Sequence, residues 1–234
     1  MMNDIFQTAL EAKQKELDTL TEHIDSLYDL SYKIQNQIED AEERQTSLEQ
    51  EVAELKMRVK AGDLGEYGYS LLFLQGKNEE EKHRNFEGYG ICRDKFIICN
   101  TYLLVALNER PPLLEENKEF SMNEEYCLSQ FNITPKETIE GKPISEYDDV
   151  TETFWKDSRY IKKPPYEVLK IGAAYVQKKF VDAVWRVLGV DEKATVQTYA
   201  YGARGTFQRR PTYSLYVSTD KGAAILMGVT PRRE

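Results

Sequence analysis

The chain has 234 residues, of which 41% are hydrophobic and 30% are charged, and its formal net charge is −9. It contains only two histidines, and its three cysteines (Cys92, Cys99 and Cys127) have no Cys-x-x-Cys spacing. Zinc sites and histidine-dependent hydrolases therefore lack their usual residues, and we expect no metal, no cofactor and no catalytic residue. The thiols are expected to be reduced and buried in a cytoplasmic protein. No apolar run is long enough to predict a membrane partner.

Charge is distributed unevenly along the chain. Residues 1–64 carry a net charge of −8 and residues 65–158 carry −9, whereas residues 159–234 carry +8. An acidic chain with a basic last third suits local contact with a polyanion, but it also suits an acidic protein partner or self-association. Charge alone leaves these three alternatives open.

A heptad pattern dominates the first 61 residues, which contain neither Gly nor Pro. Apolar residues recur every three and four positions from Leu10 to Val59, and all but three of the a and d positions are apolar. A 3.5-residue repeat of this length predicts a left-handed coiled coil, roughly 80 Å long, that ends at Gly62. The seam residues expected to form the oligomer interface are Leu17, Leu20, Ile24, Leu27, Ile34, Ile38, Leu48, Val52 and Leu55.

The seam favours a parallel homodimer. β-Branched side chains predominate at a and Leu predominates at d, which is the combination typical of parallel two-stranded coils. In that arrangement Arg44 at g would face Glu49 at e of the other chain, and Glu51 would face Lys56, so both pairs are attractive. A trimer is also compatible with the pattern, because Ile34 occupies a d position.

The remaining chain is long enough for one well-buried core. We therefore divide the sequence into a coiled-coil oligomerisation helix, residues 1–62, and one globular domain, residues 65–234. The expected fold class is α+β, a long coiled-coil helix followed by one antiparallel sheet with one or two packed helices. No internal repeat is evident. Apolar patterns and turn residues predict strands at 69–74, 89–107, 166–171, 194–200, 212–218 and 223–229, helices at 122–131 and 173–188, and a loop at 132–149.

Part of the last third resembles a known family. Residues 173–199 and 209–233 are similar to the last helix and closing strands of a DNA sliding-clamp domain, as in the bacterial polymerase processivity clamp. Tyr175-Val176, Leu188-Gly189, Pro211, Gly222 and Ala224–Met227 stand at the family's positions. The resemblance implies a clamp-like fold and a part in DNA replication. A closed ring is not implied, because the chain has room for one such domain and adds a coiled coil that the family lacks.

Two groups of residues are candidates for contact with nucleic acid. Basic residues on the solvent side of the predicted helix are expected, by the resemblance, to face duplex DNA, although they could simply be its solvated face. Aromatic and arginine residues that alternate around glycines suit base stacking, although the rings could instead be buried in the sheet. The candidates are Lys178, Lys179, Arg186, Tyr201, Arg204, Phe207, Arg209 and Arg210.

Three functions follow from these patterns. The first is a non-enzymatic oligomeric DNA-associated factor that contacts the phosphate backbone. The second is a coiled-coil interaction or adaptor module that binds another protein and makes no contact with nucleic acid. The third is a nuclease that uses the acidic cluster Glu146, Asp148, Asp149 and Glu152, but such a run is usually a solvated loop. We favour the first function, followed by the second.

Overall fold

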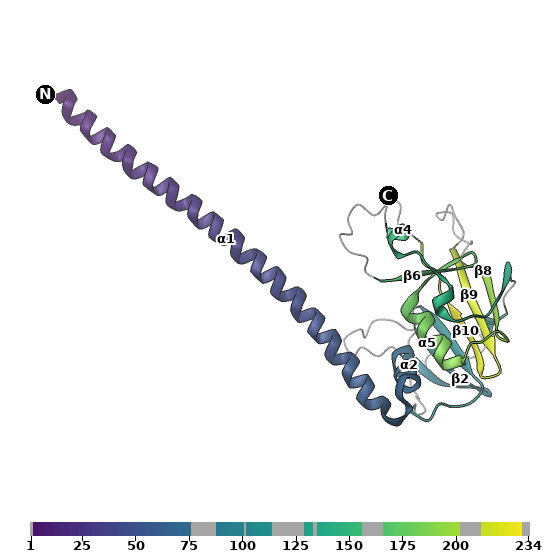
Figure 1. Cartoon of the computed structure of the whole chain (residues 1–234). Coiled ribbons are helices and arrows are strands. Elements are labelled where there is room, and N and C mark those ends of the chain that lie inside the picture. The colour runs from purple at the N-terminus through teal and green to yellow at the C-terminus, as the bar shows by residue number, and fades with distance from the viewer. Residues whose placement is uncertain are drawn as a thin grey trace. The chain divides into compact units, whose positions relative to one another are not determined.

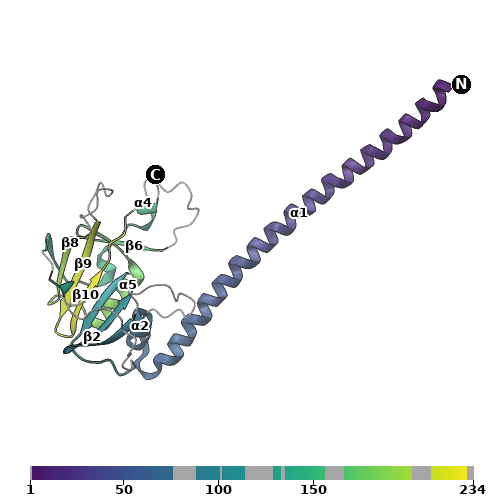
Figure 2. The same ribbon diagram turned by 180° about the vertical axis from the view of Figure 1, so that it is seen from behind.

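The computed structural model describes residues 2–75, 88–100, 102–113, 129–132, 135–155, 166–201 and 212–230. The chain forms two compact units, residues 1–56, here called the rod, and residues 57–234, here called the head. A long N-terminal helix is followed by a mostly antiparallel sheet domain with packed helices (Figures 1 and 2). This arrangement confirms the expected α+β fold class.

Helix α1 (Met2–Ala61) ends where the sequence predicted, because Gly62 adopts a left-handed backbone with φ 51°. A short 3₁₀ turn, η1 (Gly62–Leu64), and a second left-handed glycine, Gly65, lead directly into helix α2 (Gly65–Gln75). The strand predicted at 69–74 is therefore wrong. A short, continuous apolar run is compatible with a buried helix as well as with a buried strand. Here the run is helical and packs against helix α5 (Lys178–Leu188) and the sheet.

Seven antiparallel strands form the main sheet of the head, in the order β1-β2-β3-β10-β9-β8-β4. The predicted segment 89–107 contains three of them, joined by turns at Arg93-Asp94 and near Tyr102. The predicted strands at 194–200, 212–218 and 223–229 are also present, with shifted ends. The bounds are β1 (Gly88–Cys92), β2 (Lys95–Asn100), β3 (Leu103–Leu107), β4 (Glu137–Glu140), β8 (Thr195–Tyr201), β9 (Thr212–Thr219) and β10 (Gly222–Leu226).

A second sheet contains three short strands in the order β5-β6-β7. They are β5 (Asp148–Asp149), β6 (Val168–Ile171) and β7 (Ala174–Gln177). Between β5 and β6 lies a short helix, α4 (Thr151–Trp155).

The structure corrects two sequence predictions in this region. Residues 132–149 are not simply a loop, because they contain β4, a 3₁₀ turn η2 (Ile144–Glu146) and β5. The helix predicted from residue 173 begins only at Lys178, because the left-handed Gly172 turns the chain back into β7.

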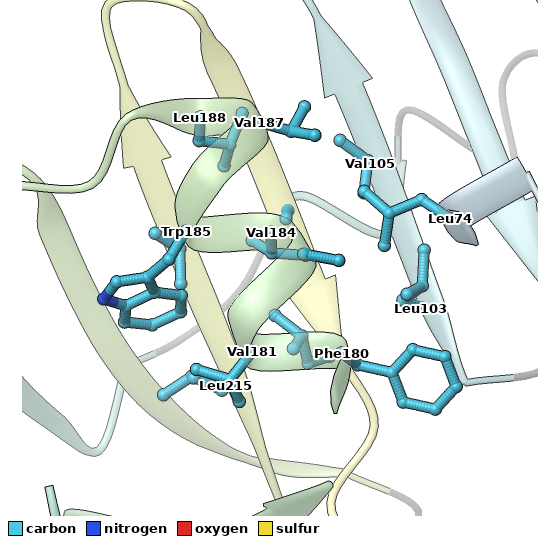
Figure 3. Packing of buried hydrophobic residues seen from close by; sticks show 14 of the residues in the cluster. Leu74, Leu103, Val105, Phe180, Val181, Val184, Trp185, Val187, Leu188 and Leu215 are labelled. Atoms are coloured by element: carbon cyan, nitrogen blue, oxygen red, sulfur yellow. The ribbon is translucent and has the colours of Figure 1, made fainter. Parts of the chain in front are cut away.

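The core of the head lies between the helices and one face of the seven-stranded sheet. Helix α5 buries seven of its eleven side chains, and α2 packs beside it. Figure 3 shows Val184 and Val187 of α5 directed toward Leu74 of α2 and Val105 of β3. The Trp185 indole N–H is satisfied by the Lys142 carbonyl oxygen at 2.9 Å. Helix α5 ends, as predicted, at Gly189, which is left-handed and donates its backbone N–H to the Trp185 carbonyl.

The opposite face of the sheet carries a smaller apolar cluster. Cys92 and Cys99 belong to it, and both are buried. This confirms the expected burial of these two cysteines, whereas Cys127 lies outside the described residues, as does most of the helix predicted at 122–131.

The head repeats one order of elements, a helix followed by three antiparallel strands. Helix α2 precedes β1, β2 and β3, and helix α5 precedes β8, β9 and β10. The last strands of the two sets pair antiparallel, with Leu103 opposite Leu226 and Leu107 opposite Gly222. This register relates the strands of the two sets by an approximate two-fold axis at the pair Val105–Ala224. The sequence shows no repeat because the two sets share only their pattern of buried positions.

Two turn residues, Asn100 and Thr219, make equivalent hydrogen bonds in the two sets of elements. The Asn100 side chain donates to the Leu74 carbonyl at 3.4 Å, and its oxygen accepts from the Tyr102 backbone N–H at 2.8 Å. At the equivalent position, the Thr219 hydroxyl donates to the Leu188 carbonyl at 2.9 Å and accepts from the Lys221 N–H at 3.2 Å. Each residue therefore closes a hairpin and also satisfies a carbonyl at the carboxyl end of a helix.

Candidate functional site

The rod exposes the whole set of seam residues that the heptad pattern selected. Their side chains lie along α1. The exposed fraction of these side chains ranges from 45% for Ile24 to 61% for Leu55. The polar side chains of the rod bond locally to one another, for example Lys13 to Glu16 at 2.6 Å and Gln45 to Glu49 at 2.8 Å. The helix thus presents a long apolar stripe whose burial requires another surface.

Helix α5 carries the three basic residues predicted to face DNA, and their surroundings differ. Lys178, the first residue of the helix, is half-buried, and its ammonium lies 3.1 Å from the Glu167 carboxylate and 3.8 Å from that of Asp149. The hydrogen bond to Glu167 raises the pKa of Lys178, and the neighbouring carboxylate charges act in the same direction. The Lys178 ammonium is therefore already paired with carboxylates of the head.

Arg186, in the last turn of α5, is also paired. Its guanidinium lies 2.8 Å from the carboxylate of Glu66 at the start of α2. The same carboxylate binds Arg58, whose guanidinium also lies 4.4 Å from the centre of the Tyr69 ring. Glu66 was missed in the sequence, because it lies 120 residues from Arg186 and nothing in the pattern links them.

Lys179 differs from its two neighbours. It is exposed, and within the described part of the chain it has no ion pair, while its ammonium lies 5.1 Å from the centre of the Phe180 ring. A lysine over an aromatic ring keeps its charge accessible to solvent. Of the three predicted helix contacts, Lys179 is therefore the one with its charge available to an anionic partner.

The second candidate group falls almost entirely outside the described residues. Arg204, Phe207, Arg209 and Arg210 are among them, and Tyr201 is described only as the last residue of β8, where its backbone pairs with Thr212. The predicted stacking surface of this hairpin stays a prediction.

In the acidic cluster considered for a nuclease, Asp149 has a structural role. The Asp149 carboxylate accepts hydrogen bonds from the Thr151 hydroxyl at 2.6 Å and the Thr151 backbone N–H at 3.0 Å. These bonds lower the pKa of Asp149 and cap the start of α4. Over the described residues, no group of three or more His, Cys, Asp or Glu side chains could hold a metal ion.

Comparison with known proteins finds no match to a family model, a curated protein or a solved structure. No helix in the described residues combines the length and apolar character that crossing a lipid bilayer requires.

Proposed function

We propose that this chain is a non-enzymatic, oligomeric protein-interaction module, in which the rod forms a parallel coiled coil and the heads act as multiple copies of one binding domain. The observation that supports it best is the exposed apolar stripe on α1, whose nine seam side chains are at least 45% exposed. Two helices of this pattern bury their stripes against each other. The g and e charges of Arg44, Glu49, Glu51 and Lys56 favour the parallel, in-register pairing.

The mass of the full chain in solution tests this proposal. Light scattering at micromolar concentration is expected to give twice the 27.2 kDa of one chain. Ile34→Lys places a charge in the seam and should release single chains, whereas Asn36→Lys, at an outward f position, adds the same charge and should leave the mass unchanged. A full chain that stays single at this concentration would refute the proposal.

A second candidate function is contact with the DNA backbone by a clamp-like head. One support is Lys179, whose charged side chain is exposed. The other is the packing of two helices on one face of an antiparallel sheet, which the resemblance to a clamp domain leads us to expect. We rank it second because Lys178 and Arg186 already bind carboxylates within the head.

Binding of a fluorescent DNA duplex at low salt tests this second proposal. Binding should weaken steeply as salt rises, since phosphate contacts release counterions. Lys179→Glu should reduce the slope of log affinity against log salt by about one, while Lys193→Glu in the loop after α5 should not. If the full chain binds no duplex at low salt, or if both variants behave alike, DNA contact through α5 is excluded.

A further inference from the structure

A hollow of about 350 Å³ lies in the head, lined by residues from the start of α2, the end of α5 and the turn that joins β9 to β10. Its walls include half-buried Tyr67 and the buried side chains of Leu107 and Val187. This volume is at the lower end of the roughly 300–1,000 Å³ that is typical of sites for small molecules. The hollow is therefore large enough for one small ligand.

Four polar side chains of the lining are available to a ligand. Within the described part of the chain, Glu109, Asp220 and Lys221 form no ion pair, and the Tyr67 hydroxyl makes no hydrogen bond. The three charged side chains are exposed. Burial raises the pKa of Tyr67 above its ordinary value of 10.0, so its hydroxyl keeps its proton at neutral pH.

Hydrogen bonds fix the turn that carries two of these groups. The Asn108 backbone N–H donates to the Lys221 carbonyl at 2.9 Å, and its side-chain amide donates to the Asp220 carbonyl. An added Cβ at Gly189 would lie 3.0 Å from the Lys221 ammonium, so this side chain runs along the carboxyl end of α5. A helix end of this kind favours a positive charge. The lining is therefore held in place without a ligand.

The approximate two-fold relation shows what fills the equivalent place in the other half of the fold. Phe73 and Val187 are equivalent, because each precedes the helix residue whose carbonyl binds a turn side chain. Tyr102 and Lys221 are equivalent, because the backbone N–H of each binds that turn side chain. The ring centres of Phe73 and Tyr102 lie 5.6 Å and 5.3 Å from that of Phe180. The hollow thus has a valine and a lysine where the other half packs two aromatic rings.

A planar heterocycle with adjacent N–H donors and a ring carbonyl matches both the missing rings and the polar lining. Carboxylates only accept hydrogen bonds, and an ammonium group only donates them. Guanine carries a ring N–H and an amino group side by side, and its carbonyl oxygen is a usual partner of lysine. Two carboxylates against one ammonium leave the lining with an excess negative charge, which disfavours a phosphate beside it.

We propose that this hollow binds the guanine base of an uncharged nucleoside. Glu109 and Asp220 accept hydrogen bonds from the N–H and amino groups of the base, and Lys221 donates to its carbonyl oxygen. Leu107 and Val187 provide apolar walls for the ring. The site lies wholly within the head, so it is independent of the proposed coiled coil.

Calorimetric titration of guanosine into the full chain tests this site. We expect one guanosine per head, with a dissociation constant between about 10 μM and 1 mM. Inosine lacks the amino group and leaves a carboxylate without its partner, so it should bind at least about tenfold more weakly. Lys221→Tyr copies the filled half and should abolish binding. Lys193→Tyr, at an exposed lysine outside the hollow, is the matched control and should bind as the parent does.

A second variant keeps the test decisive if Lys221→Tyr does not fold by circular dichroism. Glu109→Gln retains the size of the side chain and should weaken guanosine binding about tenfold, whereas Glu140→Gln on β4 should not. The proposal is overturned by absence of binding at about 1 mM guanosine, by equal binding of guanosine and inosine, or by unchanged binding in Glu109→Gln. The single chain released by Ile34→Lys should bind guanosine normally, so failure of the rod and failure of this site are distinguishable.

Discussion

Truncation of one seam side chain should weaken the association of the rod by a predictable amount. Leu48 occupies a d position and is 50% exposed in the single helix. Full burial of a leucine contributes about 1.5–3 kcal/mol, and truncation also leaves a cavity, so Leu48→Ala should cost about 1–2 kcal/mol per chain. Both chains of a dimer carry the change, so the association should lose about 2–4 kcal/mol. This corresponds to a dissociation constant raised by roughly 30- to 1,000-fold.

Sedimentation equilibrium over a dilution series measures this change directly. Leucine and alanine have similar helix propensities, so the loss reports on the seam rather than on the helix itself. Gln50→Ala, at the outward f position two residues away, is the control and should leave the dissociation constant within about threefold. If Leu48→Ala and Gln50→Ala dissociate alike, the stripe does not pair in the assumed register.

Three further predictions concern the stability of the head. Gly141→Ala should lower the free energy of unfolding by about 1–3 kcal/mol in urea titration, because the added methyl would overlap the Asp191 carbonyl oxygen; an unchanged midpoint would contradict this packing. Thr219→Val should cost about 1–2 kcal/mol, because the Leu188 carbonyl loses its donor, and thermal unfolding checks it. Burial raises the pKa of Asp182 above its ordinary value of 3.8, so the native state holds this proton more tightly. The resulting stability is present below pH 3.8 and is lost as pH rises through the higher native value. Asp182→Asn should therefore stabilise the head at neutral pH, with a gain that disappears in acid, and equal gains at pH 3 and 7 would exclude this explanation.

The sequence alone determined the parts of this protein that depend on local pattern. The heptads between Leu10 and Val59 specify a helix and its apolar stripe, because a 3.5-residue repeat places those side chains on one face regardless of the fold. Gly62 and Gly189 mark helix ends, because each adopts the left-handed conformation that glycine permits at least cost. The hairpin strands β9 and β10 were likewise readable from their alternation and the turn at Asp220-Lys221.

Tertiary structure decided what depends on distant partners. Residues 69–74 became helical because they pack between α5 and the sheet, and a short apolar run carries no period that separates a helix from a strand. Lys178 and Arg186 appeared on the sequence to be free charges of a solvated helix, but the fold brings Glu167 and Glu66 within ion-pair distance of them. The pairing of β3 with β10, and with it the two-fold relation between the two sets of strands, joins residues more than 100 positions apart. Such contacts leave no mark on local sequence, because only the packing of the whole core makes them favourable.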